Sequence, residues 1–286
     1  MCGNKMKVPF VGDCMRIFFI LFLAATSVKS QTITGTVIDA LTQEPLPFVH
    51  VGVTGKNLGT IADDRGRFTL DLDRLDITDS LTFSSIGYGK KCVSPRRLTV
   101  NTVVELSPRS YALRTYDFRP RGERLELGRR QPTKTTTGQK TAGEFGFGQE
   151  WGLKIDQPDA PYRLETVRFH TRFNTADSIL FRINVYTLRD GLPHESLLQS
   201  AAYTTSRRKE KWIEADLSDR NIWVDENIVV TVELVRIWYR NRGKDAIFFT
   251  HADDLPDATT FHRESSLDRW RTNEWSPFVL SVVGTQ

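Results

Sequence analysis

Apolar and polar residues alternate in short runs through the first third of the chain, and no stretch there keeps a helical period over three turns. Val49, Val51 and Val53 show the strictest alternation. Turn-forming segments such as residues 63–66 (Asp-Asp-Arg-Gly) separate the runs. The other strand-marking positions are Ile33, Val37, Phe68, Leu70, Leu72, Leu81, Phe83, Leu98, Val100, Val104 and Leu106. This pattern predicts a small antiparallel β-sandwich over residues 31–110.

Longer alternating runs follow in the second half of the chain. They cover residues 167–173, 179–185 and 228–234, and residues 278–282 form a closing strand. Each run has one apolar and one polar face, as in antiparallel sheets that bury one side. We expect a jelly-roll-like β-sandwich of roughly eight strands over residues 148–286. The predicted fold class is therefore all-β, with two sandwiches.

The segment between the two predicted sandwiches, residues 111–147, is rich in Pro, Thr, Gly and basic residues. Residues 118–150 hold seven basic and four acidic side chains. Such a composition lacks core-forming residues and predicts a solvated basic linker. Contact with an anionic polymer or lipid surface is the alternative explanation of its charge. Nucleic acid is excluded as a partner because aromatic platforms for bases are missing around the segment.

The first 30 residues have the anatomy of a secretory signal peptide. Lys5, Lys7 and Arg16 precede an apolar core at residues 17–25, and small residues lead up to Gln31. This core is shorter than the ~20 apolar residues that a membrane-spanning helix needs. We expect residues 1–30 to be removed, which leaves no transmembrane segment. The expected location is the periplasm or the exterior of a Gram-negative cell.

The chain carries 39 Lys+Arg and 35 Asp+Glu, a formal net charge of +4. Four basic and one acidic side chain fall within residues 1–30, so the remainder has a net charge of +1. The basic balance is therefore no sign of nucleic-acid binding. Cys2 and Cys14 also fall within the leader, which leaves Cys92 and no internal disulfide. We expect Cys92 to be a small buried apolar residue rather than a nucleophile.

Several groups of residues in the first predicted sandwich resemble the carboxypeptidase regulatory-like domain. The first group is Gly35, Val37, Asp39, Thr42, Pro45, Leu46, Pro47, Val49 and Val51. The others are Gly59 and Thr60, then Asp63, Gly66, Phe68 and Leu70, then Leu81, Phe83, Ser84, Ile86, Gly87 and Tyr88. The resemblance implies a seven-stranded, transthyretin-like sandwich that serves as a structural or binding accessory rather than as a catalyst.

The second predicted sandwich resembles the jelly-roll domain that is appended to regulatory-like domains in exported bacterial proteins. The matching positions are residues 181–186, 191–193, Leu197, Leu198, Lys211, Trp212 and 215–217. Such sandwiches are similar to carbohydrate-binding modules. The resemblance thus implies a glycan, or another envelope protein, as the partner.

One cluster of polar residues fits such a ligand. If strands 164–174 and 179–186 pair, their polar faces become continuous. The residues of this predicted ligand-binding face are Arg168, His170, Arg172, Arg182, Asn184 and Tyr186. Guanidinium forks, an amide and an aromatic ring supply the hydrogen bonds and stacking that a sugar or anionic glycan needs. The alternative is a plain solvated sheet face.

The tryptophans leave the position of an aromatic platform open. Trp212 follows Lys211 within a strand, and we expect it to lie in the core because tryptophans are usually well buried. The residues that could be either core or platform are Trp223, Trp238, Trp270 and Trp275.

No catalytic, metal or cofactor site is predicted. Residues 194–198 begin like a zinc-binding helix motif but lack its second histidine. The acidic loop 253–257 could hold Ca²⁺, but without EF-hand spacing it is expected to be a solvated loop. Glu165, Glu214 and Glu233 could pair as glycosidase acids, yet nothing in the sequence brings them together.

The sequence therefore predicts an exported, non-catalytic accessory or binding protein of the bacterial cell envelope, with glycan binding assigned to its C-terminal sandwich. Two alternatives stay open. One is a hydrolase of polysaccharide or peptide, and the other is a structural subunit of an envelope assembly.

Overall fold

The computed structural model describes residues 32–71, 75–76, 78–98, 101–109, 122–132, 147–241, 247–250, 258–273 and 279–286. The predicted signal peptide, the acidic loop 253–257 and Trp275 lie outside these residues. Residues Thr32–Gln286 form one compact unit. No helix within the described ranges is long and apolar enough to cross a membrane.

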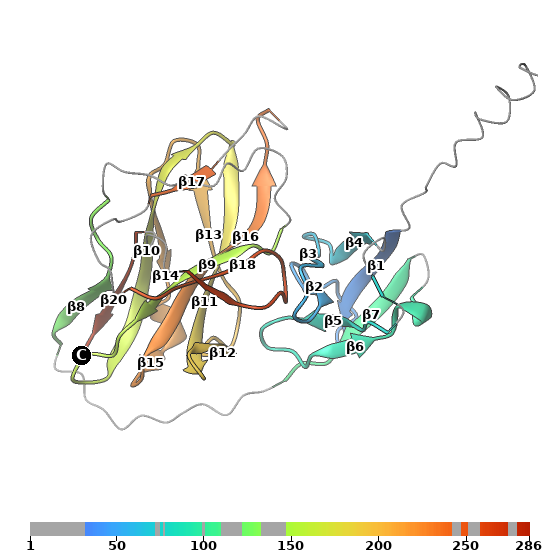
Figure 1. Ribbon diagram of the computed structural model, residues 1–286, viewed down its shortest axis with the longest axis horizontal. Helices are drawn as coiled ribbons and strands as arrows, with labels where there is room; N and C mark the ends of the chain where they lie inside the picture. Colours follow the sequence, from blue (N-terminus) through green and yellow to red (C-terminus); the bar gives the residue numbers. More distant parts are fainter. Residues whose placement is uncertain are drawn as a thin grey trace, which may run out of the picture. The chain divides into compact units, whose positions relative to one another are not determined.

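Seven strands form the first sandwich (Figure 1). They are β1 (Thr32–Asp39), β2 (His50–Val53), β3 (Gly59–Ile61), β4 (Arg67–Asp71), β5 (Leu81–Ser84), β6 (Lys91–Val93) and β7 (Thr102–Leu106). One sheet has the order β4-β1-β7 and the other β3-β2-β5-β6. All neighbours are antiparallel except β1 and β7, which run parallel. The short helix η1 (Pro95–Arg97) precedes β7, so Leu98 lies outside the strand predicted for it.

The first core follows from alternation along the strands. In β1 every second side chain from Ile33 onward is buried, and the ring of Phe68 packs edge-to-face on Phe83 at 5.3 Å between centroids. Gly35 allows this packing, because a Cβ there would lie 2.7 Å from Cζ of Phe68. The predicted burial of Cys92 is wrong, because its side chain is exposed on the edge strand β6.

Two residues that carry the family resemblance form one contact. The hydroxyl of Tyr88 donates a hydrogen bond to Oδ2 of Asp39 over 2.8 Å, and Oδ1 of Asp39 accepts one from the amide of Leu41 over 2.7 Å. These bonds tie the turn after β1 to the loop after β5, and they lower the pKa of Asp39 below its ordinary value.

Thirteen described strands form the second sandwich. They are β8 (Arg124–Gly128), β9 (Glu150–Ile155), β10 (Tyr162–Asn174), β11 (Ser178–Arg189), β12 (Leu192–Ser196), β13 (Ala202–Arg207), β14 (Trp212–Asp216), β15 (Ile222–Val224), β16 (Ile228–Trp238), β17 (Ile247–Phe249), β18 (Thr260–Arg263), β19 (Arg271–Asn273) and β20 (Leu280–Thr285). The short helix η2 (Ser218–Arg220) precedes β15.

Two sheets make up this sandwich. One has the order β14-β10-β20-β8, with β15 and β17 also paired to β10. The other has the order β12-β11-β16-β9-β18-β19, with β13 paired to β11. The all-β fold class and the sandwich architecture are thereby confirmed.

One strand arises where the sequence predicted a linker. β8 lies within residues 111–147 and pairs with β20, where Glu126 stands opposite Val283. Leu125 and Leu127 of β8 pack against the second core, which gives this piece of the basic segment a structural role. A fragment that begins at residue 148 would lose β8 and leave the edge of β20 unpaired.

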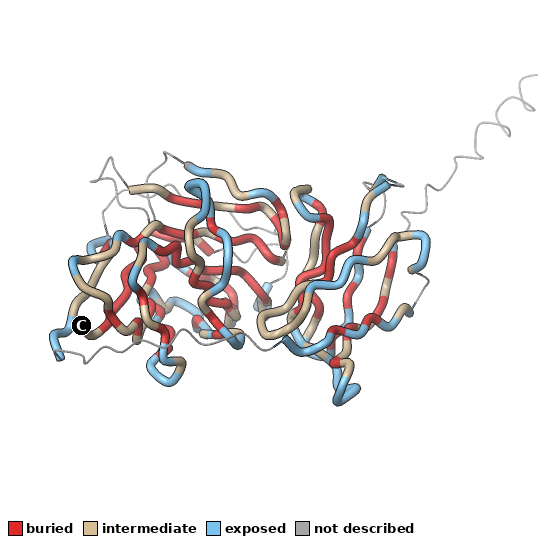
Figure 2. The backbone as a smooth tube through the Cα atoms, turned by 90° about the horizontal axis from the view of Figure 1, so that it is seen from below, coloured by how far each residue is buried: buried red, intermediate tan, exposed pale blue. Residues whose placement is uncertain are grey.

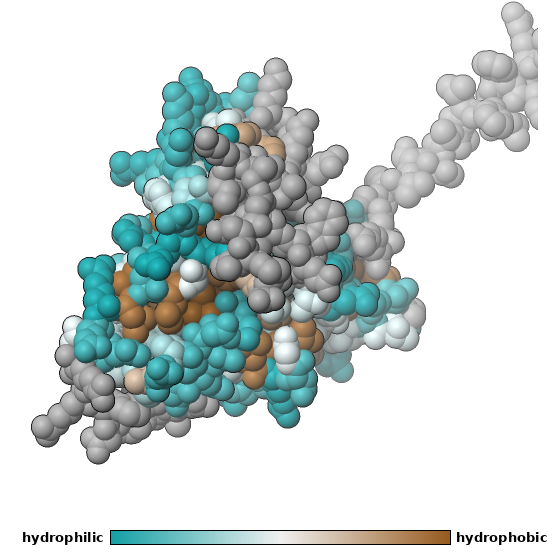
Figure 3. Space-filling view, turned by 60° about the vertical axis from the view of Figure 1, so that its left-hand side comes forward, coloured by the Kyte–Doolittle hydropathy of each residue, from teal (hydrophilic) through white to brown (hydrophobic). Residues whose placement is uncertain are grey.

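The second core lies between β10 and β11. Phe169 and Phe181 meet at 5.2 Å between ring centroids, and Phe249 lies 6.2 Å from each of them. Figure 2 shows the buried stretches inside both sandwiches and the exposed ones in the turns. On the face seen in Figure 3, hydrophilic residues cover most of the described surface and hydrophobic residues gather in patches between them.

We predict that Phe169→Ala lowers the free energy of unfolding by about 3–5 kcal/mol, because the mutation leaves a cavity among the three rings. Urea denaturation measures this change. Val103→Ala in β7 is the control, since Val103 is 59% exposed, and its effect should stay within about 0.5 kcal/mol. Equal effects of the two mutations would contradict this assignment of the core.

Candidate functional site

The structure divides the six predicted ligand-binding residues between two sheets. Arg168, His170 and Arg172 lie on β10, whereas the other three lie on β11. The pairing expected between these strands is wrong: β10 pairs with β14, β15, β17 and β20, and β11 pairs with β12, β13 and β16. The apolar sides of β10 and β11 instead pack on each other across the core, so their polar sides point away from each other.

The outer side of β10 and β14 forms the first candidate site, which we call the β10–β14 face. Its outward side chains are Arg168, His170, Arg172, Trp212, Glu214 and Asp216, and Lys211 flanks the end where Trp212 lies. Arg168 stands opposite Glu214, and His170 stands opposite Trp212. Nε and Nη2 of Arg168 donate hydrogen bonds to Oε1 of Glu214 over 2.8 and 2.5 Å. This pair is charge-neutral, and in the register of β10 and β14 it lies next to the pair of His170 and Trp212.

Trp212 is exposed on this face, so its predicted place in the core is wrong. Ile213 and Ala215 take the buried side of β14, and 40% of Trp212 is accessible to solvent. Its ring meets that of His170 edge-on, at 4.8 Å between centroids. Since tryptophans are usually well buried, an exposed ring on a flat sheet face is a candidate platform for a ligand.

His170 packs against the ring of Trp212 and is held in place by a neighbouring threonine. Its Nδ1 lies 2.6 Å from the hydroxyl oxygen of Thr250. Burial, together with the positive charges of Lys211 and Arg172, lowers the pKa of His170 below its ordinary value. The ring is therefore neutral at pH 7. The β10–β14 face thus joins an exposed indole to an ordered guanidinium–carboxylate pair, a combination that can stack on a sugar ring and hydrogen-bond its hydroxyls.

Arg182 and Asn184 belong to a different structure, a buried charge network on the outer side of the other sheet. The members of this network are His50, Glu150, Arg182, Asn184, Glu233 and Arg263, and all are buried. Glu233 and Glu150 are fully buried, and the exposed fraction of Arg182 is 2%.

The first half of the network joins the two sandwiches. Nε2 of His50, in β2, lies 2.5 Å from Oε1 of Glu233 and 2.8 Å from Nη1 of Arg182. Nη2 of Arg182 donates a hydrogen bond to the carbonyl oxygen of Phe48 over 2.5 Å. Nearby, Arg236 on β16 forms an ion pair of 2.8 Å with Asp64.

The second half of the network lies within the second sandwich. Nδ2 of Asn184 donates to Oε1 of Glu150 over 2.8 Å and to Oε2 of Glu233 over 3.2 Å. Glu150 also accepts a hydrogen bond from the hydroxyl of Thr231 and forms an ion pair with Arg263. The guanidinium of Arg263 stacks over Trp270, with Cζ 4.6 Å from the ring centroid.

Tyr186, the sixth predicted residue, lies beside this second half. Its ring meets that of Trp270 at 5.7 Å between centroids. Burial and the neighbouring charge of Glu150 raise the pKa of Tyr186. The polar groups of Arg182, Asn184 and Tyr186 therefore face protein partners.

The network contains equal numbers of carboxylates and guanidiniums, which come from Glu150, Glu233, Arg182 and Arg263. Burial opposes ionisation of Glu233, but the charges of Arg182 and Arg263, together with the hydrogen bond to His50, outweigh it and lower the pKa of Glu233. Burial, reinforced by Arg182 and Arg263, lowers the pKa of His50 despite the opposing effect of Glu233. His50 is therefore neutral at pH 7, and the network carries no net charge.

A close backbone approach accompanies the network. The amide of Gly55 donates a hydrogen bond to the carbonyl of Leu267 over 2.8 Å. A Cβ at Gly59 would overlap the carbonyl oxygen of Ser266. Gly59, which the family resemblance singled out, thus has a packing reason here: it admits the loop before β19 against β3.

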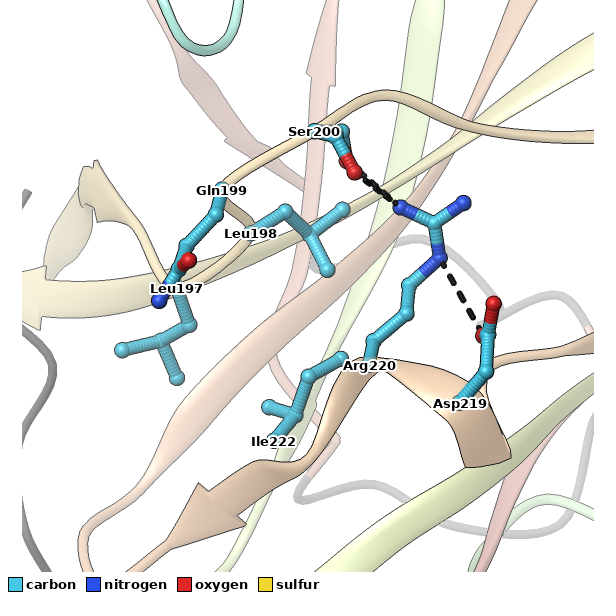
Figure 4. A pocket seen from close by; sticks show the side chains of 7 residues that line it. All are labelled: Leu197, Leu198, Gln199, Ser200, Asp219, Arg220 and Ile222. Atoms are coloured by element: carbon cyan, nitrogen blue, oxygen red, sulfur yellow. Dashed lines mark hydrogen bonds and ion pairs between the residues drawn. The ribbon is translucent and has the colours of Figure 1, made fainter. Parts of the chain in front are cut away.

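A pocket of about 250 Å³ lies elsewhere on the second sandwich (Figure 4). Its lining residues are Leu197, Leu198, Gln199, Ser200, Asp219, Arg220 and Ile222. Nη1 of Arg220 donates to the carbonyl and hydroxyl oxygens of Ser200 over 2.9 and 2.7 Å. No sequence pattern indicated this pocket, because its walls come from a loop, the short helix η2 and the start of β15, which share no motif.

The carboxylates considered as glycosidase acids each have a cationic neighbour. Glu165 accepts a hydrogen bond from Nη2 of Arg163 over 2.5 Å, Glu214 is paired with Arg168, and Glu233 belongs to the buried network. Within the described part of the chain, no group of three or more His, Cys, Asp or Glu side chains is arranged to hold a metal ion.

Comparison with known proteins identifies the first sandwich. The geometry defines an all-β protein built from two sandwiches. Residues 33–114 match the family model of the CarboxypepD_reg-like domain. The first sandwich is therefore a carboxypeptidase regulatory-like domain, as its motifs predicted. None of the curated proteins matches the chain.

Among solved structures, the chain is similar to the crystal structure of the cysteine protease and lectin-like domains of Cwp84, a surface layer associated protein of Clostridium difficile. The sequence identity is 9% and the TM-score 0.40. The match covers 84% of this chain and 58% of that one.

We predict that Arg182→Ala lowers the free energy of unfolding by about 3–5 kcal/mol, because it leaves the buried carboxylate of Glu233 without its guanidinium. Arg168→Ala is the matched control. It removes an arginine from a partly exposed ion pair, which contributes about 1 kcal/mol or less. Chemical denaturation of both variants tests the difference, and a smaller loss for Arg182→Ala than for Arg168→Ala would contradict the role of the network.

We predict that the wild-type protein loses stability as the pH falls below about 6.5, the ordinary pKa of histidine. Unfolded His50 takes up a proton in this range, whereas the lowered pKa of folded His50 means that it takes up a proton only at lower pH, so acid favours the unfolded chain. His170 and His262 shift in the same direction, so the wild type must be compared with His50→Gln. Thermal unfolding from pH 7.5 to 5 should show a shallower decline in the variant. Equal slopes would show that His50 does not contribute.

Proposed function

We propose that this chain is an exported, non-catalytic accessory protein of the bacterial cell envelope that binds glycans through the β10–β14 face. The observation that carries the proposal is the exposed indole of Trp212, which lies beside the ordered pair of Arg168 and Glu214. Binding sites combine apolar surface with a few well-placed polar groups, and this face offers both.

The regulatory-like domain would then act as a scaffold. Its contacts cover part of the outer side of the sheet that holds Arg182 and Glu233, through His50 and Phe48. This leaves the β10–β14 face, on the other sheet, as the side on which the predicted ligand-binding residues Arg168, His170 and Arg172 lie. Export is supported by the signal-peptide pattern of residues 1–30.

The hydrolase alternative has less support. Glycosidases need one carboxylic acid and one carboxylate close together across a bound sugar. Glu165, Glu214 and Glu233 instead each interact with an arginine. The face around Trp212 is thus better suited to hold a glycan than to cleave it.

The test is a glycan array probed with the chain from Gln31 to Gln286, which retains β8. We expect binding to at least one glycan, and we expect Trp212→Ala to weaken it tenfold or more through loss of stacking. Trp238→Ala is the matched control, since Trp238 is also 40% exposed but lies on β16. An array without binding, or equal binding by the two variants, would refute the proposal.

A further inference from the structure

We propose that the ligand of the β10–β14 face is an acidic polysaccharide, with uronate carboxylates along its chain. This inference rests on the proposed glycan binding and adds the charge of the ligand. It starts from the positive side chains at the end of the face where Trp212 lies.

Lys211 and Arg172 flank the platform. The amide of Thr171 donates a hydrogen bond to the carbonyl of Lys211 over 2.7 Å, which holds Lys211 next to β10. Trp212 follows Lys211 and stands opposite His170. Both Lys211 and Arg172 are exposed; Lys211 directly precedes Trp212, and Arg172 lies two residues beyond His170 on β10.

The charges at this end are not balanced within the face. Arg168 is neutralised by Glu214, and His170 is neutral at pH 7. Among the described residues, neither Arg172 nor Lys211 forms an ion pair with a carboxylate. The end of the β10–β14 face at Trp212 therefore has two positive charges without a paired carboxylate, Arg172 and Lys211, whereas the carboxylate of Asp216 lies at the other end of β14, opposite Thr166.

This local charge opposes that of its surroundings. Residues 151–286 contain 18 Lys+Arg against 20 Asp+Glu, so the second sandwich as a whole is slightly acidic. The turn between β13 and β14 adds to the positive end. Arg208 and Lys209 are exposed there, and the turn is held by a hydrogen bond of 2.7 Å from the amide of Arg207 to Oε2 of Glu210.

The positive charges of Arg172 and Lys211 favour an acidic sugar over a neutral one. A neutral sugar gains stacking on Trp212 but leaves Arg172 and Lys211 without partners, whereas a uronate residue provides carboxylates for both. Arginine and lysine form charge-assisted hydrogen bonds with carboxylates. A single exposed indole suits a pyranose ring better than it suits a run of bases, since single-stranded nucleic acids use successive aromatic platforms.

The test compares each acidic polysaccharide with its esterified form, which has the same sugar backbone without the charge. Suitable pairs are polygalacturonate with methyl-esterified pectin, and alginate with its propylene glycol ester. Calorimetry with the chain from Gln31 to Gln286 at about 50 mM salt should show at least tenfold tighter binding of an acidic form. Salt at about 500 mM should reduce this preference, because ions screen exposed charges.

Charge variants link the preference to the face. Arg172→Gln combined with Lys211→Gln should abolish the preference for the acidic form, so that the acidic polymer and its ester bind this variant with equal affinity. The control combines Arg65→Gln with Lys90→Gln, which removes the same charge from exposed positions of the first sandwich and should preserve the preference.

The outcomes separate the two proposals. Equal binding of acidic and esterified forms would overturn the acidic ligand and retain glycan binding. The same holds if neutral glycans bind on the array but neither acidic polymer binds, or if the control pair has the same effect as the face variant. Absence of any glycan binding would overturn the proposed function itself. Tighter binding to single-stranded DNA than to either acidic polysaccharide would identify the face as a nucleic-acid site instead.

Discussion

The burial of two carboxylates and two guanidiniums on the outer side of the β11–β16 sheet constrains the rest of the structure. Removing Glu150, Glu233, Arg182 and Arg263 from water is costly, and the cost is offset only when every partner is in place. One of these partners, His50, comes from the regulatory-like domain. The position of β2 on the second sandwich is thus set by hydrogen-bond geometry, which tolerates less displacement than an apolar contact of similar size.

This constraint separates the two outer faces of the second sandwich. The network, the loop before β19 and the regulatory-like domain occupy one face, where polar residues find protein partners. The other face keeps Trp212 exposed and holds Arg168 through Glu214. The asymmetry explains how a sheet with buried arginines and a sheet with an exposed tryptophan coexist in one domain.

The sequence predicted the positions of the strands well, but it predicted poorly which strands pair with each other in a sheet. Alternation with period two reveals a buried face, so the strands around Phe68, Phe83, Phe169 and Phe181 were found. The same alternation cannot distinguish strands that pair within a sheet from strands that pack across a core, and for this reason β10 and β11 were joined wrongly. Trp212 was placed in the core because tryptophan is a residue type that is usually buried. In β14, however, Trp212 lies two residues before Glu214 and therefore on the same outer side of the strand. No local signal tells a buried arginine from an exposed one, since the partners of Arg182 lie far away in the sequence.

The polar character of the contact between the sandwiches also bears on the order in which the chain is made. The regulatory-like domain is complete once β7 has been synthesised, long before Glu233 emerges, and domains generally fold as units during synthesis. During that interval the surface around His50 and Asp64 faces water. A surface of hydrogen-bonding groups stays hydrated without attracting other unfinished chains, as an exposed apolar patch would. Because the contact is charged, the regulatory-like domain can stay folded without aggregating until the second sandwich has been synthesised.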